Sequence, residues 1–292
     1  MRSPSPPLVL ALLVLALLVL PGFSASGLSG QVVELPDRVT TSIAPPAPVP
    51  FGPGEILRYQ VKLGVFSVGE GHMTVVGLET VRGSPTYHVV MGISGGVPLA
   101  RVEDEFHSWI DITTLTTRRF IQDIREVRYR AFRHYEIFPE ERRYERMDAD
   151  DAGDLPTSLP LDDIAFVYFV RTLPLEVGQE YSFDRYFRES GNPVILRVLR
   201  KETVTVPAGT FETIVVRPII QTRGLFSQGG EAELYFTDDH RRLLVQMRSK
   251  VPLVGSISLH LRSITEGTPL RPVSRGESPP GQGLEESPAP GP

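Results

Sequence analysis

The sequence predicts a mainly β protein, a curved antiparallel sheet or half-barrel that encloses one buried helix at about residues 161–173. Three observations predict this fold. Apolar side chains recur at every second position over much of the chain, turn residues separate these stretches, and one apolar segment breaks the period of two. Residues 51–266 are long enough to form a single β-rich domain with one sizeable core.

The first predicted strand shows the alternation most clearly. The apolar residues Leu57, Tyr59, Val61, Leu63 and Val65 alternate with Ile56, Arg58, Gln60 and Lys62. The same pattern joins Tyr87, Val89, Met91 and Ile93, and later Val127, Tyr129, Ala131, Tyr135 and Ile137. Parallel strands are buried on both faces and read as continuous apolar runs, so this alternation favours antiparallel strands with one face in water.

Turn residues punctuate the later strands. The sequence Val206-Pro207-Ala208-Gly209 fits a type I turn, with Pro at the second position and Gly at the fourth. Gly229-Gly230 and Thr237-Asp238-Asp239 separate further apolar runs. Hairpins are predicted at these places.

One segment, Leu159 to Leu173, breaks the period of two. Pro160, Asp162 and Asp163 fall where a helix tolerates a missing donor and favours negative charge. The remaining residues from 161 to 172 are almost all apolar, on every side of the predicted helix. We therefore predict a helix that is covered on both sides; a strand is the alternative, because β-branched and aromatic residues also suit strands.

The two ends of the chain are predicted to lie outside the domain. Residues 8–20 contain only Leu, Val and Ala, and this run is shorter than the ~20 residues that cross a bilayer. Residues 1–26 are predicted to be a signal peptide, with an uncleaved anchor as the alternative. Residues 27–50 are predicted to be a Pro-rich linker, and 267–292 a disordered Pro/Gly-rich tail. A soluble periplasmic protein is the expected product.

The composition excludes several classes of function. The chain has no Cys, which rules out disulfides, Cys-ligated zinc, iron–sulfur clusters and a thiol nucleophile. Its formal charge of −5 and pI near 5.8 argue against nucleic-acid binding, which needs a strongly basic face. No cofactor is predicted.

Several segments, in order along the chain, resemble one known family. They are Phe51 to Tyr59, Val65 to Gly71, Asp104 with Ser108-Trp109-Ile110-Asp111, Asp162 to Leu175, Val206 to Thr213, and Asp238 to Arg242. This series is similar to the bacterial domain of unknown function 3108, a family of exported, β-rich envelope proteins. The resemblance implies a fold and a location, and it supplies no catalytic residue. The layout also resembles the half-barrel lipoprotein-carrier proteins, at the level of fold only.

A possible nucleophile elbow is better explained as a turn. Gly92-Ile93-Ser94-Gly95-Gly96 matches the pattern G-x-S-x-G. A nucleophile elbow needs a helix directly after the Ser, whereas Pro98 and the alternating run from Leu99 predict another strand. We predict no catalytic residue here.

Two groups of acidic residues are also better explained as surface. Glu103 and Glu105 would lie on one strand face about 6.5–7 Å apart, which overlaps the spacing of inverting glycosidases. No neighbour in sequence would raise the pKa of either one, as such catalysis requires. The acidic loop at 148–154 lacks oxygen ligands where a calcium loop needs them. No metal site is predicted, and an envelope hydrolase is the third alternative for function.

The stretch from Arg118 to Arg146 contains nine Arg and six acidic residues. The pattern favours paired strands with charge pairs across them. The alternative is contact with anionic headgroups or envelope polymers, because Arg presents planar donors to phosphate. Arg128, Arg130 and Arg133 are the candidates for this contact.

The function predicted from these features is non-catalytic binding or carriage of an apolar ligand, a lipid or acyl molecule. The candidate contacts are Tyr59, Val61, Leu63, Tyr87, Val89, Phe166 and Phe169. In this hypothesis the segment 164–170 is a plug in the concave face, displaced when an acyl chain enters. The alternative is a structural or protein-interaction β module of the periplasm, with an interior filled by its own side chains and an envelope protein as partner.

Overall fold

The computed structural model describes residues 49–97, 100–127, 129–220, 232–251 and 255–270. Within these ranges the chain forms one antiparallel sheet of fourteen strands, one α-helix and one 3-10 helix. The predicted signal peptide, most of the predicted linker and tail, and the predicted turn at Gly229-Gly230 lie outside the described residues.

The elements follow one another with short connections. The strands are β1 (Ile56–Leu63), β2 (Phe66–Val81), β3 (Ser84–Val97), β4 (Ala100–Asp111), β5 (Thr117–Arg125), β6 (Arg130–Phe138), β7 (Arg143–Arg146), β8 (Asp151–Asp154), β9 (Glu180–Phe183), β10 (Val194–Val206), β11 (Gly209–Ile219), β12 (Glu233–Thr237), β13 (Leu244–Val251) and β14 (Gly255–Thr265). The helix α2 (Asp163–Val170) and the 3-10 helix η1 (Glu189–Gly191) lie between β8 and β10.

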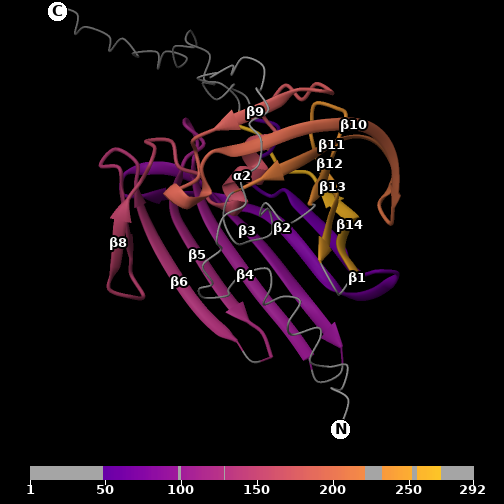
Figure 1. Ribbon diagram of the computed structural model, residues 1–292, viewed down its shortest axis with the longest axis horizontal. Helices are drawn as coiled ribbons and strands as arrows, with labels where there is room; N and C mark the ends of the chain where they lie inside the picture. The colour runs from indigo at the N-terminus through magenta and orange to yellow at the C-terminus, as the bar shows by residue number, and fades with distance from the viewer. Residues whose placement is uncertain (1–48, 98–99, 128, 221–231, 252–254, 271–292) are drawn as a thin grey trace, which may run out of the picture.

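The first and last strands meet in the middle of the sheet. The order of strands is β8-β7-β6-β5-β4-β3-β2-β1-β14-β13-β12-β11-β10-β9. One arm is built by the N-terminal half of the chain and the other by the C-terminal half (Figure 1). Each pair of neighbouring strands is antiparallel, as the alternation of apolar residues predicted.

The C-terminal arm curls over the helix. The backbone N–H of Ala208, in the turn between β10 and β11, donates to the carbonyl of Leu261 on β14 at 3.0 Å. These strands are not neighbours in the sheet, so the arm must bend back toward its own start. The sheet stays open, because β8 and β9 are free edges in the strand order (Figure 1). The predicted curved sheet around one buried helix is confirmed.

The alternation fixes which side chains enter the core. Leu57, Tyr59 and Val61 are buried, whereas Arg58 between them is exposed. The alternation places Val65 in this row as well, and this is wrong: Val65 lies in the turn after β1 and is 84% exposed. Val127 is likewise exposed, at the bend that follows β5. Alternation holds only while the chain stays extended, and a turn ends it.

Two of the predicted hairpins are confirmed. Strands β10 and β11 are joined at Pro207-Ala208, and β12 and β13 are joined through Asp238 and Asp239. The described part of the predicted tail, residues 267–270, lies against the start of the domain, where the Thr268 N–H donates to the carbonyl of Pro53 at 2.9 Å.

The helix is buried as predicted but shorter. All residues from Ile164 to Val170 are buried. Asp162 caps the first turn, and Leu161 before it forms a bridge with Tyr186 instead of joining the helix. Within the described ranges, no helix has the length and apolar character needed to cross a membrane.

Candidate functional site

Asp162 fixes the first turn of α2 to the concave face of the sheet. Its Oδ1 accepts hydrogen bonds from the backbone N–H groups of Ile164 (2.7 Å) and Ala165 (2.9 Å), which caps the helix. Its Oδ2 accepts from the hydroxyls of Ser108 on β4 (2.5 Å) and Thr117 on β5 (2.8 Å). Burial raises the pKa of Asp162, and these hydrogen bonds oppose that rise.

A buried ion pair fixes the other end of α2. The guanidinium of Arg171 donates to both carboxylate oxygens of Glu55, at 2.6 and 2.9 Å. It also donates to the backbone carbonyls of Pro50 (3.3 Å) and Arg241 (3.1 Å). Arg171 and Glu55 are 3% and 4% exposed. Separating a buried pair leaves an uncompensated charge, so these contacts oppose displacement of the helix.

The residues predicted to contact a ligand form the packed core around α2. Six of them are almost fully buried: Tyr59, Val61, Tyr87, Val89, Phe166 and Phe169. Leu63, at the end of β1, is half-buried. The hydroxyl of Tyr59 donates to the carbonyl of Leu244 on β13 at 2.9 Å. Six of these residues share one packed interior, and their contact with a ligand stays a prediction.

The concave face continues beyond the helix. Strands β3 to β6 extend well past α2 (Figure 1). In the first row beyond the helix, Met91 on β3 is paired with Phe106 on β4, which is paired with Gln122 on β5, and Gln122 with Arg133 on β6. Ile93 follows Met91 on β3, and both Ile93 and Phe106 are partly buried against the core. The surface is therefore apolar at β3 and β4 and polar toward β6.

Two buried carboxyl groups lie on the same face near its far end. Asp104 on β4 and Glu126, just after β5, are 5% and 6% exposed. Burial raises the pKa of Asp104 to about 6. Burial, and then the charge of Asp104, raise the pKa of Glu126 to about 7. The Arg125 N–H donates to Asp104 at 2.9 Å, whereas neither oxygen of Glu126 has a hydrogen-bond partner.

The arginine-rich stretch contains many charge pairs. Arg119 pairs with Glu136 at 2.5 Å, and Arg118 pairs with Asp111 at 3.0 Å. Arg133 donates instead to the side chains of Gln122 and Tyr129. Arg130 is exposed, and Arg128 lies outside the described residues. Contact of Arg128, Arg130 and Arg133 with an anionic surface stays a prediction.

Two serines in the described part of the chain, Ser94 and Ser258, lack the arrangement that would activate a nucleophile. Ser94 lies within β3 on the outer face of the sheet, with no helix after it. The Ser258 hydroxyl contacts Nε2 of His260 at 2.9 Å, an arrangement that alternation alone did not reveal. Burial, with the charges of Lys62 and Arg248, lowers the pKa of His260 to about 4, which makes it a poor base at neutral pH. No group of three metal-ligating side chains occurs in the described ranges.

The acidic residues that the sequence suggested as a pair are exposed, whereas the residue between them is buried. Glu103 and Glu105 are exposed on the outer face of β4, where Glu105 contacts His107 at 2.7 Å. Asp104, between them in sequence, faces the interior. The sequence could have indicated this, because Asp104 alternates along β4 with Phe106 and Ser108, which also face the interior. Phe106 is apolar, and Ser108 donates a hydrogen bond to Asp162 at the start of the helix.

The family is decided by one comparison. A family model described as "Protein of unknown function (DUF3108)" matches residues 58–262 of this chain. The chain belongs to the DUF3108 family. The match covers the ordered landmarks found in the sequence except most of the first, Phe51 to Tyr59, and the predicted family is confirmed. The description of the DUF3108 family assigns no reaction and no ligand.

Solved structures similar to this DUF3108 protein have low sequence identity to it. One is a β-barrel-like protein of domain of unknown function DUF1849 from Brucella abortus, with a TM-score of 0.47 and 8% identity, covering 74% of this chain and 98% of that chain. Another is described as a "putative lipoprotein" from Parabacteroides distasonis, with a TM-score of 0.33 and 13% identity, covering 75% and 99%.

A third is described as a "putative exported protein" with a YmcC-like fold from Bacteroides fragilis, with a TM-score of 0.28 and 11% identity, covering 75% of this chain and 99% of that chain. A search of curated proteins finds no match to the DUF3108 chain.

Proposed function

We propose that this DUF3108 protein is an exported envelope protein that binds an apolar or acyl-bearing molecule on the concave face of its sheet, without catalysing a reaction. The observation that supports this most directly is the row of side chains beyond α2. It begins with apolar residues on β3 and β4 and ends with polar ones on β5 and β6. A ligand with an apolar chain and a polar head matches such a surface.

The ligand in this proposal lies beside the helix and does not replace it. Displacing α2 would break the cap at Asp162 and the buried pair between Arg171 and Glu55. Removing one partner of such a pair costs about 3–5 kcal/mol. Burying a few methylene groups of an acyl chain gives back about 0.8 kcal/mol each, so the surface past α2 is the less costly place to bind.

The location is part of the same proposal. The apolar run at residues 8–20 has the length of a signal-peptide core, which supports export. A polar envelope compartment is where an acyl chain needs a protein surface to cover it, because its transfer through water is unfavourable.

The proposal predicts that Phe106→Asn weakens binding of an acyl ligand. Phe106 lies on the concave face and is partly buried, so the substitution puts an amide into the proposed contact. Losing the burial of one Phe side chain is worth about 1.5–3 kcal/mol, which corresponds to an affinity about ten- to a hundredfold lower. Titration with cis-parinaric acid, followed by fluorescence, measures this change.

Phe132→Asn is the matched control. Phe132 is 54% exposed on the outer face of β6, and its substitution leaves the concave face intact. Equal weakening by both variants, or no binding of cis-parinaric acid by the unchanged protein, would contradict the proposal. Native mass spectrometry of protein purified from its own host provides the second measurement, with co-purifying lipid as the expected result.

A structural or protein-interaction module is the second candidate function. It is favoured by the filled interior, in which six of the seven predicted ligand contacts are already buried. In that case the concave face beyond α2 would hold a side chain of a partner protein. Protein that binds no acyl probe but crosslinks to one envelope protein through a photoreactive group at Phe106 would favour this candidate.

A further inference from the structure

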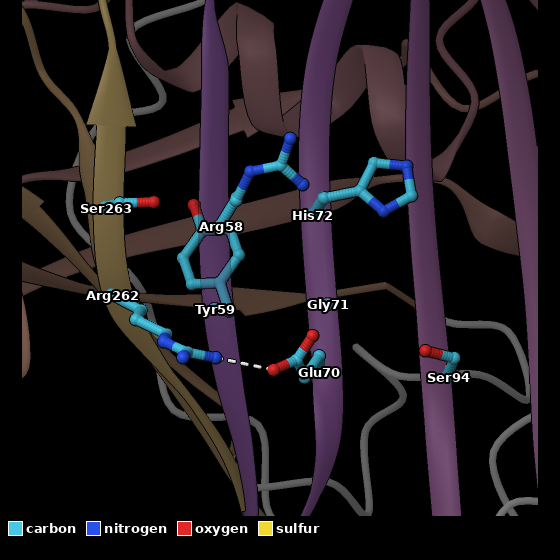
Figure 2. A pocket seen from close by; sticks show the side chains of 8 residues that line it. All are labelled: Arg58, Tyr59, Glu70, Gly71, His72, Ser94, Arg262 and Ser263. Carbon is cyan, nitrogen blue, oxygen red and sulfur yellow. Dashed lines mark hydrogen bonds and ion pairs between the residues drawn. The ribbon is translucent and has the colours of Figure 1, made fainter.

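The outer face of the sheet carries a polar hollow, on the opposite side from the concave face. It has a volume of about 510 Å³ and lies over β14, β1, β2 and β3 (Figure 2). We call it the outer pocket; its lining residues are Arg58, Tyr59, Glu70, Gly71, His72, Ser94, Arg262 and Ser263.

A β-bulge places a second arginine at the outer pocket. Arg58 is paired with Ser263, and Tyr59 with Leu261, so Arg262 is an extra residue in β14. Leu261 faces the core, and the extra residue lets both Arg262 and Ser263 lie exposed on the outer face. Bulges redirect side chains in this way and are common beside functional sites.

Gly92, which has no side chain, leaves room for His72 at the β2–β3 side of the outer pocket. His72 on β2 is paired with Gly92 on β3, and its ring lies across that strand (Figure 2). A Cβ atom at position 92 would lie 2.3 Å from Cε1 of His72, which is too close for any real contact. Glycine at this position therefore lets the imidazole lie flat, beside the Arg58 side chain.

Several hydrogen-bond donors at the outer pocket have no partner. Arg58, His72 and Ser94 make no side-chain hydrogen bond or ion pair with the described part of the chain, whereas Arg118 and Arg119 at the other end of the sheet are paired. Arg262 is held by an ion pair with Glu70. In Figure 2 the Arg58–His72 side and the Arg262–Glu70 side face the same gap.

The surroundings of the pocket toward β14 are basic. Two arginines face one carboxylate within it, and Lys62 lies further along β1. On the neighbouring strand β14, burial and then the charges of Lys62 and Arg248 lower the pKa of His260. Glu105 and His107 face His72 from β4, on the other side. The potential thus favours an anion at the β1–β14 side of the hollow.

The number and geometry of donors indicate which anion fits. Two guanidinium groups, an imidazole and a hydroxyl offer more donors than the two oxygens of a carboxylate accept, whereas a phosphate has three or four oxygens. The hollow is also much larger than a bare phosphate ion. We propose that the outer pocket binds a phosphate ester, with Arg58 and Arg262 contacting the phosphate oxygens and His72 and Ser94 donating further hydrogen bonds.

This site goes beyond the proposed acyl binding and does not depend on it, because the two surfaces lie on opposite faces of the sheet. The phosphate ester has two possible sources, a soluble molecule or the headgroup of a phospholipid. Glycerophosphoglycerol and vesicles of phosphatidylglycerol present the same phosphodiester in these two forms, and they are the probes for the test.

The test is a titration of the full chain with each probe, using amide NMR shifts for the soluble ester and co-sedimentation for the vesicles. We expect Arg58→Gln to weaken binding at least about tenfold, because a charge-assisted hydrogen bond is lost. Arg58 is exposed, so the variant should keep its fold. Amide shifts centred on residues 58, 72, 94 and 262 would identify the ligand as a soluble ester. Binding to vesicles alone, weakened to the same extent by Arg58→Gln, would identify it as a lipid headgroup.

Arg197→Gln is the matched control. Arg197 is also an exposed arginine, and it lies on β10 in the C-terminal arm, outside the outer pocket, where it pairs with Glu180. Equal weakening by Arg197→Gln and Arg58→Gln would mean general attraction to charge and would overturn the proposal. Failure of the unchanged protein to bind either probe would also overturn it. Cis-parinaric acid binding should be the same in Arg58→Gln as in the unchanged protein, so the two proposals fail separately.

Discussion

Glu126 shows how a single residue can oppose the stability of the protein that contains it. Its carboxyl group is buried without a hydrogen-bond partner, and its pKa is raised to about 7 by burial and by the charge of Asp104. In the unfolded chain the same group has an ordinary pKa of 4.5. Between these values the folded protein binds more protons than the unfolded chain, so stability falls as the pH rises through this range.

Glu126→Gln should therefore stabilise the protein at pH 8 and have little effect at pH 5. Gln carries no charge that burial can penalise, and we expect a gain of about 1–2 kcal/mol in the free energy of unfolding, after allowance for solvent screening. Urea denaturation at the two pH values measures it. Glu103→Gln, at an exposed position on β4, is the control and should change neither value. A gain from Glu126→Gln that is equal at both pH values would contradict the raised pKa.

Some of these features of single residues could be predicted from the sequence, and others could not. Inward rows could be read from alternation, and Asp104 stands in such a row with Phe106. The outer pocket could not be read, because its arginines are about 200 positions apart and meet only through the pairing of β1 with β14. A β-bulge at Arg262 also shifts that pairing by one residue, and the alternation of apolar residues does not predict a bulge.

At the scale of the element, contacts at its start decide where α2 begins. The sequence predicted a helix at 161–173, and the structure has one from 163 to 170. The difference arises because Asp162 is used as a cap and Leu161 pairs with Tyr186. Apolar composition indicated that the segment is buried, but tertiary contacts decided where the helix begins and ends.

Arg171→Met should destabilise the protein by about 3–5 kcal/mol, because it leaves Glu55 buried and unpaired. Urea denaturation measures this change. Combining it with Glu55→Leu removes both charges, and the double variant should recover part of the loss. A double variant less stable than Arg171→Met alone would contradict this account. Arg197→Met, which breaks the exposed pair with Glu180, should cost less than about 1 kcal/mol.

At the scale of the whole molecule, protection is expected to decrease from the middle of the sheet to its edges. Strands β1 and β14 have a neighbour on each side, whereas β8 and β9 are four-residue edge strands. Hydrogen exchange followed by mass spectrometry should therefore show slower exchange in β1 and β14 than in β8 and β9. Slower exchange at β8 than at β1 would contradict it.

The overall architecture was the most predictable level. Period-two alternation and turn chemistry indicated an antiparallel sheet, and one buried segment indicated a helix inside its curve. The strand order was not predictable, because alternation says which face a residue occupies and nothing about its neighbour. Contacts such as that between Ala208 and Leu261, which close the curl, depend on the order.

The meeting of β1 and β14 has a consequence for how the protein is made. A ribosome releases the N-terminal end of a chain first, so β1 emerges long before the strand that completes its pairing. Until β14 (Gly255–Thr265) has been synthesised, β1 and β13 each have one unpaired edge. Unpaired strand edges promote association between chains. A chain that stops short of residue 255 would lack the strand that joins its two arms.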